Sequence, residues 1–253
     1  MLRLDGRVAV VLGGTSGIGL ALTKGLADAG ADVVSTSRRK EQVEEAAAEV
    51  EARGRRTLRV PTDVTERPAL ESLLAEVVAA FGKVDILVNC AGRTKRVPTL
   101  EMSDADWDAI LQTNLTGTLR GSQVFGRHMI ERGYGRIVNI ASLTSFVGMM
   151  EVAAYTASKS AVAGLTRALA VEWGPKGVNV NAIAPGVFRT ALNSALLDTD
   201  RGRELLLRTP LGRYGRVEEL QGACVFLASE AASFVNGEVL AVDGGFLASG
   251  VNQ

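Results

Sequence analysis

A tyrosine, a serine and a lysine lie close together in an alanine-rich segment of helical character. Tyr155, Ser158 and Lys159 fall within the stretch "AAYTASKSAVAGLTRALA", residues 153–170. Residues four apart stack on one face of a helix, so Tyr155 and Lys159 are expected side by side. A phenol in that position could be a proton donor whose pKa the neighbouring ammonium lowers. The alternative is an ordinary half-buried helix face, and the rest of the sequence bears on the choice.

The elements that must position these side chains alternate between short apolar runs and longer amphipathic segments. The apolar runs predict strands at residues 7–12, 32–35, 57–60, 86–89, 136–140, 179–183 and 239–242. Most lack polar alternation, as do strands buried on both faces of a parallel sheet. We therefore predict an α/β fold of the Rossmann type over residues 1–253, a single domain with a doubly wound seven-stranded parallel sheet and helices on both faces. Residues 187–215 break the rhythm and predict a mobile helical lid over the site.

Composition argues against several classes of site and partner. Lysines and arginines number 28 and so do aspartates and glutamates, so the net charge of zero offers no attraction to nucleic acid or an anionic membrane. One histidine, His128, and two cysteines give too few ligands for a His/Cys metal site, and neither a metal nor a disulfide is expected. No apolar run approaches the ~20 residues that span a bilayer, and no signal peptide is recognisable, so we expect a cytoplasmic protein.

A glycine-rich turn follows the first predicted strand and opens a helix. In "VAVVLGGTSGIGLALTKGLADAG" the glycines Gly13, Gly17 and Gly19 have the spacing G-x3-G-x-G. Glycine allows a tight turn whose backbone N–H groups approach a pyrophosphate, and the helix N-terminus favours that negative charge. A plain strand-to-helix turn is the alternative, because such a turn alone is weak evidence. Its place at the start of a chain-long alternation favours a dinucleotide site.

The tip of the second predicted strand bears on which dinucleotide is bound. NAD use is usually marked there by a carboxylate on the ribose 2′-hydroxyl, but Asp32 lies at the other end of the strand. The tip instead carries Ser37, Arg38 and Arg39, which leave room and supply charged donors for a 2′-phosphate. The alternative is a solvated helix start. We favour NADP(H), with NAD(H) as the second choice.

Further candidates stand at the carboxyl ends of later strands, where an open α/β sheet binds its ligands. The run "ILVNCAG" ends the fourth strand, and "RIVNIAS" places Ser142 thirteen residues before Tyr155. With these residues in place, the sequence closely resembles the short-chain dehydrogenase/reductase family over essentially the whole chain. The resemblance rests on the glycine turn, Asp63-Val64, the N-x-A-G loop at 89–92, Asn114, Ser142, Tyr155-x3-Lys159 and Pro185-Gly186.

The resemblance implies an oxidoreductase in which Tyr155 is the general acid/base and Ser142 holds the substrate oxygen. It also implies that Lys159 favours the phenolate and binds the nicotinamide ribose, while Asn114 keeps a water relay to Lys159. The cofactor-binding residues it implies are Gly13, Thr15, Ser16, Gly17, Ile18, Gly19, Ser37, Arg38, Arg39, Asp63, Val64, Asn89, Ala91, Gly92, Tyr155, Lys159, Pro185, Gly186, Val187 and Thr190. Among these, Asp63 and Val64 are expected at the adenine and Thr190 at the carboxamide. Members of the family are commonly homotetramers, joined through helices near 103–132 and 155–173 and the C-terminal strand region.

Two positions depart from the family pattern. Leu12 stands where a threonine commonly precedes the glycine turn, and Cys90 replaces the second asparagine of N-N-A-G. The first change removes a hydroxyl that would tie the turn to its neighbour. Cys90 is expected to be a packed thiol, because no obvious base accompanies it.

The substrate is the least determined part of the prediction. The loop "RTKRVPT" adds Arg93, Lys95 and Arg96 at the mouth of the site, which suits an anionic substrate, although a solvated surface loop is the alternative. The stretches 140–160 and 235–253 resemble gluconate 5-dehydrogenase-like and deoxyhexonate dehydrogenase-like members of the family, which implies a sugar acid or polyol. The candidate substrate contacts are Arg93, Arg96, Thr144, Met149 and Phe188. The alternatives are a 3-oxoacyl-[acyl-carrier-protein] reductase and, more remotely, a catalytically silent NADP-binding redox sensor.

Overall fold

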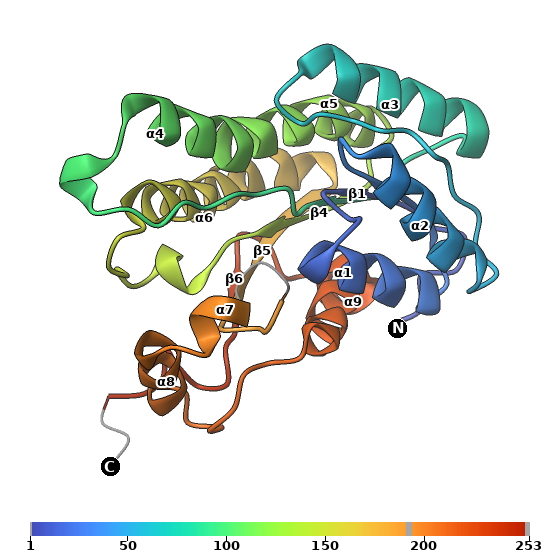
Figure 1. Ribbon diagram of the computed structural model, residues 1–253. Helices are drawn as coiled ribbons and strands as arrows, with labels where there is room; N and C mark the ends of the chain where they lie inside the picture. The colour runs from blue at the N-terminus through green and yellow to red at the C-terminus, as the bar shows by residue number, and fades with distance from the viewer. Residues whose placement is uncertain (1, 191–193, 251–253) are drawn as a thin grey trace.

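The structure, a computed structural model, describes residues 2–190 and 194–250 of the 253-residue chain. Within these residues six parallel strands form one sheet in the order β2-β1-β3-β4-β5-β6 (Figure 1). The strands are β1 Val8–Leu12, β2 Asp32–Thr36, β3 Ile86–Asn89, β4 Gly135–Ile140, β5 Val178–Pro185 and β6 Val239–Val242. All residues of β1, β3 and β4 are buried, which explains why their sequences lack polar alternation. The predicted α/β class with a parallel sheet is confirmed.

Helices cover both faces of this sheet. Their bounds are α1 Gly17–Asp28, α2 Lys40–Glu51, α3 Arg67–Phe81, α4 Asp104–Leu111, α5 Gly117–Glu131, α6 Ala153–Trp173, α7 Ser194–Leu197, α8 Asp200–Leu207 and α9 Gln221–Ala228. Figure 1 shows α1, α2 and α9 on one side of the sheet and α3, α4, α5 and α6 on the other. A π-helical turn, Gln112–Thr116, joins α4 to α5.

Successive residues of β1 supply the two hydrophobic cores. Ala9 and Val11 face the core that includes α1 and α9, whereas Val8 and Val10 face the core that includes α3, α5 and α6. Side chains on a strand alternate between its faces, so one short apolar run serves both layers. The sheet is therefore held from both sides, and its strand ends are fixed in space.

The predicted strand at residues 57–60 is wrong, and the sheet has one strand fewer than expected. This segment runs beside β2, where the Val33 N–H donates to the Arg56 carbonyl and the Thr62 N–H donates to the Ser37 carbonyl. These isolated backbone bonds do not form a continuous ladder, so the apolar run remains an extended edge segment. The fold class is unaffected, because the segment lies outside β2 at the edge of the sheet.

The strand order reverses beside β1, because the chain goes from β1 to β2 on one side and then to β3 on the other. A crevice opens at such a switch point beyond the carboxyl ends of the strands. The predicted lid forms α7 and α8, which lie apart from the layered body near the C-terminal segment (Figure 1). Residues 191–193 of the predicted lid lie outside the described residues, and its mobility stays a prediction.

Candidate active site

Tyr155, Lys159 and Ser142 meet at the carboxyl edge of the sheet. Tyr155 lies in the first turn of α6, and the Lys159 Nζ one turn later is 5.7 Å from the centre of the tyrosine ring. Ser142 follows the end of β4, and its hydroxyl shares a hydrogen bond with the Tyr155 side chain. The backbone N–H of Thr144 donates to Ser142 Oγ at 3.2 Å and fixes the serine. A substrate oxygen can be held and protonated between such groups.

Burial disfavours the charged form of both ionisable groups. It raises the pKa of the Tyr155 phenol, and the hydrogen bond with Ser142 opposes that rise. Burial also lowers the pKa of Lys159 to about 8. The Lys159 side chain is buried, and its Nζ donates a 2.6 Å hydrogen bond to the Ile140 carbonyl. The predicted lowering of the tyrosine pKa is therefore not produced by the lysine alone.

Asn114 links the loop after β3 to α6. It lies in the π-helical turn, is fully buried, and its amide nitrogen donates to the Arg93 carbonyl at 2.9 Å and to Ser158 Oγ at 3.0 Å. Its amide oxygen accepts from the Arg93 N–H at 2.8 Å. Single π-turns are frequent at functional sites, where they displace a residue from the regular helix. Here the turn directs Asn114 between two elements of the site, and the water relay stays a prediction.

The glycine turn is shaped by contacts that leave no room for a Cβ atom. A Cβ on Gly13, whose φ is +80°, would lie 2.6 Å from the Ala91 backbone. A Cβ on Gly19 would lie 2.0 Å from the Gly13 carbonyl oxygen. The following helix α1 has Ser16 as N-cap without a side-chain cap bond and has no acidic residue in its first turn. Its first N–H groups are thus able to receive an anion, so the residues present fit a dinucleotide pyrophosphate.

The tip of β2 carries positive charge where an adenosine ribose would lie. The exposed Arg38 guanidinium is 3.9 Å from the Asp63 carboxylate, and Ser37 Oγ accepts from the Arg39 N–H at 3.3 Å. The other Asp63 oxygen accepts from the Thr65 N–H and hydroxyl. The neighbouring Val64 is buried against α5, and Thr15 donates to Gln42 from the glycine turn.

Asp32 lies at the opposite end of β2 and has a structural partner. Its carboxylate accepts from the Arg56 guanidinium at 2.6 Å and from the Arg56 N–H at 2.9 Å. This carboxylate therefore does not serve the ribose 2′-hydroxyl, as the sequence indicated.

The segment after β5 returns over the glycine turn. The Gly186 N–H donates to the Val242 carbonyl at 2.8 Å, and a Cβ on Gly186 would lie 2.5 Å from the Asp243 Cα. The Thr190 methyl group is 3.8 Å from the Cβ position of Gly17. The structure therefore places Thr190 beside the glycine turn, and the cofactor contacts of Pro185, Gly186, Val187 and Thr190 stay predictions.

Two predicted contact residues have their side chains in the core instead. Asn89 is 4% exposed and donates to Ser122 Oγ and Asn139 Oδ1 beneath the site. Phe188 is 5% exposed and packs with its ring against Gly215. Both side chains point inward, and the cofactor contact of Asn89 and the substrate contact of Phe188 stay predictions.

The two positions that depart from the family pattern are both packed. Burial raises the pKa of the Cys90 thiol to about 11, so this group remains a protonated thiol at neutral pH. Cys90 and Cys224 are both free thiols. Leu12 is buried in the core on the α5 side.

The basic loop after β3 is largely paired with acidic side chains. Lys95 Nζ lies 2.6 Å from an Asp106 carboxylate oxygen, and Arg96 Nε donates to the Glu151 carboxylate. Arg93 is exposed, and its backbone is held by Asn114. The loop is therefore neither a simple solvated surface nor a free cluster of positive charge.

A groove of about 770 Å³ lies between this loop, the loop that leads to α6, and α8. Its lining includes Arg96, Met149, Met150, Arg201, Leu205 and Phe246. Sequence reasoning placed Arg96 and Met149 near a substrate but missed Arg201. No motif marks Arg201, because it comes from a separate helix about fifty residues beyond Glu151. The only available signal was its place within the predicted lid.

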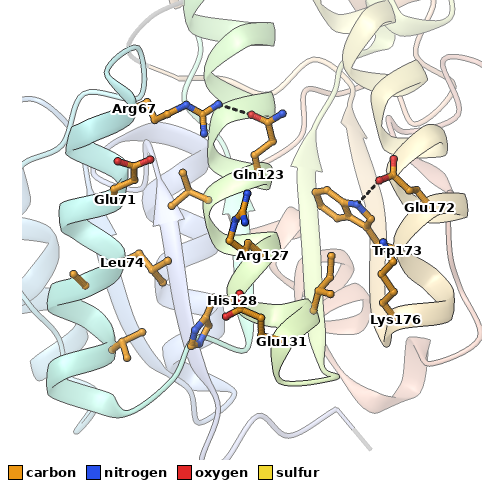
Figure 2. Close-up of a pocket in the computed structure, with 14 residues that line it drawn as sticks. Arg67, Glu71, Leu74, Gln123, Arg127, His128, Glu131, Glu172, Trp173 and Lys176 are labelled. Carbon is orange, nitrogen blue, oxygen red and sulfur yellow. Dashed lines mark hydrogen bonds between the residues drawn. The ribbon is translucent and has the colours of Figure 1, made fainter.

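A second cavity, of about 980 Å³, lies on the outer face of α5 between α3 and α6 (Figure 2). Four of its polar side chains are bonded in pairs, with Arg67 donating to Gln123 and the Trp173 indole donating to Glu172. His128 accepts a hydrogen bond from the Val84 N–H at 3.2 Å and so ties α5 to the segment before β3. Although larger, this cavity is remote from the strand ends and from Tyr155, so we do not assign catalysis to it.

A doubly wound parallel sheet, a pyrophosphate-type glycine turn and a Ser-Tyr-Lys group at the strand ends define a dinucleotide-dependent oxidoreductase. Comparison with known proteins agrees. The family model described as "Enoyl-(Acyl carrier protein) reductase" matches residues 13–247. The 2-dehydro-3-deoxy-D-gluconate 5-dehydrogenase of Dickeya dadantii is 45% identical over 250 residues, 97% of each chain. The gluconate 5-dehydrogenase of Gluconobacter oxydans is 44% identical over 250 residues, 98% of each chain.

A solved structure extends the comparison to three dimensions. The gluconate 5-dehydrogenase from Burkholderia cenocepacia, solved in complex with NADP and tartrate, has a TM-score of 0.94, 42% identity and 98% coverage of each chain. The chain belongs to the short-chain dehydrogenase/reductase family and is an NAD(P)-dependent oxidoreductase that acts on CH–OH groups. Among the described residues, we find no helix with the length and apolar character needed to cross a membrane.

Proposed function

We propose that this enzyme interconverts a secondary alcohol and a carbonyl on a sugar acid, using NADP(H). The observation that carries the proposal is the convergence of Ser142, Tyr155 and Lys159 at a crevice beside the glycine turn. The relatives that share this chain over nearly its whole length, at 44–45% identity, are named for gluconate and dehydrodeoxygluconate. Together these observations support a polar hydroxy acid as substrate.

The chain's residues supply binding and proton handling in this proposal. Ser142 holds the substrate oxygen by a hydrogen bond, and Tyr155 gives a proton to that oxygen in reduction or removes it in oxidation. Lys159 places a positive charge beside the phenol and binds the nicotinamide ribose. Burial lowers the pKa of this ammonium and so favours release of its proton. The bound nicotinamide supplies or accepts the hydride. Asn114 fixes the loop that backs this arrangement.

The choice of NADP over NAD rests on the tip of β2. Arg38 and Arg39 are exposed there, and Asp32, the carboxylate of this strand, is tied to Arg56 at the far end. An arginine pairs well with a phosphate through its planar set of donors. The Burkholderia relative was solved with NADP.

Reduction of 3-oxoacyl thioesters is the second enzymatic candidate. The matching family model carries an acyl-carrier-protein description. An acidic carrier protein requires a basic docking face, but Lys95 and Arg96 at the mouth of the site are already paired with Asp106 and Glu151. The sugar-acid proposal therefore has the stronger support. A silent redox sensor would have no need of the Ser142–Tyr155 hydrogen bond.

A substrate panel tests the proposal. Purified enzyme is assayed for NADP⁺ and NAD⁺ reduction with gluconate, and for NADPH and NADH oxidation with keto-sugar acids, ketoses and acetoacetyl thioesters. Turnover of a sugar acid, faster with the NADP(H) pair, is expected. Turnover of thioesters alone would show that the enzyme reduces 3-oxoacyl chains and not sugar acids. Cofactor binding without any turnover would favour the sensor.

We further propose a homotetramer, as the family resemblance implies, and a cytoplasmic location, as the sequence composition suggests. The second cavity, on the outer face of α5, lies on the helices through which family members commonly associate. Val171, on α6, is 80% exposed. Gly121 lets α5 pack close to β3, and Gly126 lets it pack close to Trp173 of α6. The outer face of α5 therefore lies deeper than the neighbouring helices α3 and α6. A recessed, partly apolar face of this kind suits a helix from a second copy.

A further inference from the structure

Arg201 of α8 has an incompletely satisfied guanidinium at the substrate groove. Its side chain is 17% exposed, and its Nη2 donates to the Met150 carbonyl at 2.8 Å. The buried Nη1 has no hydrogen-bond acceptor among the residues that the structure describes. The nearest paired acid is Glu151, whose carboxylate oxygen lies 3.8 Å away, beyond a hydrogen bond. Leaving a buried charged donor without an acceptor costs free energy, so an anion that accepts from Nη1 would bind favourably here.

Glu151 supplies only a long ion pair to Arg201, because the same carboxylate is hydrogen-bonded to another arginine. Arg96 Nε donates directly to the same carboxylate oxygen of Glu151. The Glu151 carbonyl also accepts from the Val97 N–H at 2.8 Å, which fixes the acid against the loop after β3. Glu151 has a φ of 65°, a conformation that non-glycine residues rarely adopt. Its position is thus determined by the two loops rather than by Arg201.

Among the cations that the described residues place on this wall of the groove, Arg201 is the one whose guanidinium is both held by a backbone hydrogen bond and left with a buried unpaired donor. Asp200 pairs with Arg203. Arg208 is 5.8 Å from the centre of the Phe246 ring. Glu204 also lines the groove and adds a negative charge. These placements leave the Arg201 Nη1 as a fixed donor beside the paired Arg96.

One wall of the groove is formed by the loop that joins Ser142 to Tyr155. Met150 and Glu151, which flank the Arg201 guanidinium, belong to the loop that runs from Ser142 to Tyr155. Met149 and Met150 supply apolar surface on the same wall. A hydroxy acid with its reacting carbon at Tyr155 therefore extends along this loop toward α8.

We propose that Arg201 binds the carboxylate of the substrate and makes the enzyme selective for sugar acids over neutral polyols. This inference rests on the proposed function and names the residue that sets its substrate class. The Met150 carbonyl orients the guanidinium, and Nη1 donates to the substrate carboxylate in a charge-assisted hydrogen bond. On the opposite wall, Glu151 neutralises the charge of Arg96. The substrate carboxylate can then balance the charge of Arg201.

The test compares two substrates that differ only at the end bound by Arg201. Gluconate and glucitol share their remaining hydroxyl-bearing carbons, but glucitol has an alcohol in place of the carboxylate. In Arg201→Gln the kcat/KM for gluconate is expected to fall by about 10- to 100-fold, mainly through KM, whereas that for glucitol stays within about twofold. Arg201→Lys keeps the charge but not the planar donors, so its kcat/KM for gluconate is expected to lie between those of the wild type and Arg201→Gln. Arg203→Gln, two positions along α8, is the matched control and should leave both substrates unchanged.

A binding measurement keeps the test independent of turnover. The melting temperature of the NADP⁺ complex is measured with and without gluconate, and the gluconate-dependent rise should be present in the wild type and lost in Arg201→Gln. If Arg201→Gln retains both the preference for gluconate and the rise, Arg201 is not the anchor while the proposed function stands. If the wild type oxidises glucitol as well as gluconate, or if it binds and turns over no sugar acid of the panel, the sugar-acid function is refuted and the anchor with it.

Discussion

At the scale of single residues, the site combines two groups whose charged forms are both disfavoured by burial. Burial raises the pKa of Tyr155 and lowers that of Lys159 to about 8. A protonated Lys159 is therefore a buried ammonium. Such a group is expected to reduce the free energy of unfolding.

Replacing that lysine should stabilise the protein while inactivating it. The pKa of Lys159 is lowered from 10.5 in the unfolded chain to about 8 in the folded protein. Below pH 8 the ammonium is therefore charged in both states, and its burial lowers the free energy of unfolding by a constant amount. Lys159→Met should therefore raise Tm at pH 7 by about 2–6 °C. Wild-type stability recovers as the pH rises from 8 toward 10.5, so the difference should narrow in that window. Thermal unfolding of both proteins between pH 6 and 10 measures it, and a lower Tm for the variant at pH 7 would contradict it.

Cofactor choice should depend on a single exposed arginine. Arg38 is the cation nearest Asp63 at the tip of β2, and Arg38→Ala should raise the KM for NADPH by about 10-fold or more, with NADH changed less than about twofold. Steady-state kinetics with both cofactors provide the measurement. Lys40→Ala, at the start of α2, is the matched control. An equal loss with both cofactors would show that Arg38 acts on the fold rather than on the 2′-phosphate.

The residue types at the site could be predicted from the sequence, whereas their partners could not. Ser142, Tyr155 and Lys159 have a recognisable spacing, and the structure brings them together. The pairing of Arg96 with Glu151 and the orientation of Arg201 join three segments far apart in the chain. Such contacts depend on the path of loops, which no local periodicity encodes.

At the scale of elements, the glycine turn is the most tightly constrained part of the cofactor site. Gly13 packs on the loop after β3, and Gly19 packs on Gly13, so the turn, α1 and the 90–92 loop fit together as one unit. Glycine residues are needed there because of backbone contact as well as cofactor approach.

Adding one methyl group at Gly19 should therefore damage both cofactor binding and stability. In Gly19→Ala the new Cβ would lie 2.0 Å from the Gly13 carbonyl oxygen, so the turn must open. We expect NADPH affinity to fall by more than about 10-fold and the free energy of unfolding to fall by about 1–3 kcal/mol. Isothermal titration and denaturant unfolding measure the two effects.

The matched control is an alanine at an unobstructed helical glycine. Gly222 in α9 has nothing within 4 Å of its Cβ position, so Gly222→Ala should gain up to about 1 kcal/mol from helix propensity without affecting NADPH binding. If Gly19→Ala binds NADPH as tightly as Gly222→Ala, the turn does not shape the cofactor site.

The elements themselves were predictable where they are long or buried on both sides. Strands β1, β3, β4 and β5 show apolar runs that lie between two cores, and the structure confirms them. The failure at 57–60 has a different origin. An apolar run at the edge of the sheet forms a strand only if consecutive backbone bonds are made, and here the Arg56 carbonyl and the Thr62 N–H bond to β2 at isolated positions.

At the scale of the whole molecule, one face of the sheet carries the recessed α5, and the carboxyl edge carries the site. The cavity between α3 and α6 is separate from the groove beside α8. If copies of the chain associate through that cavity, as proposed, a substitution there should change assembly without changing turnover.

A charge on the exposed part of α6 should weaken assembly. Val171→Asp places a carboxylate at a residue that is 80% exposed on α6. If this surface joins subunits, size-exclusion chromatography with light scattering should give a four-chain mass for the wild type and a smaller mass for the variant. Leu2→Asp, at an exposed position near the N-terminus, is the control. A monomeric wild type would refute the proposed tetramer.

The most direct test of the account is the behaviour of Tyr155→Phe. This change removes the phenolic oxygen that transfers the proton and keeps the ring that packs in the first turn of α6. We expect turnover of a sugar acid to fall by at least about 100-fold, with the Kd for NADPH, measured by fluorescence titration, within about twofold of the wild type. Full activity in the variant would show that Tyr155 is not the acid/base, and the mechanism proposed for this site would then be wrong.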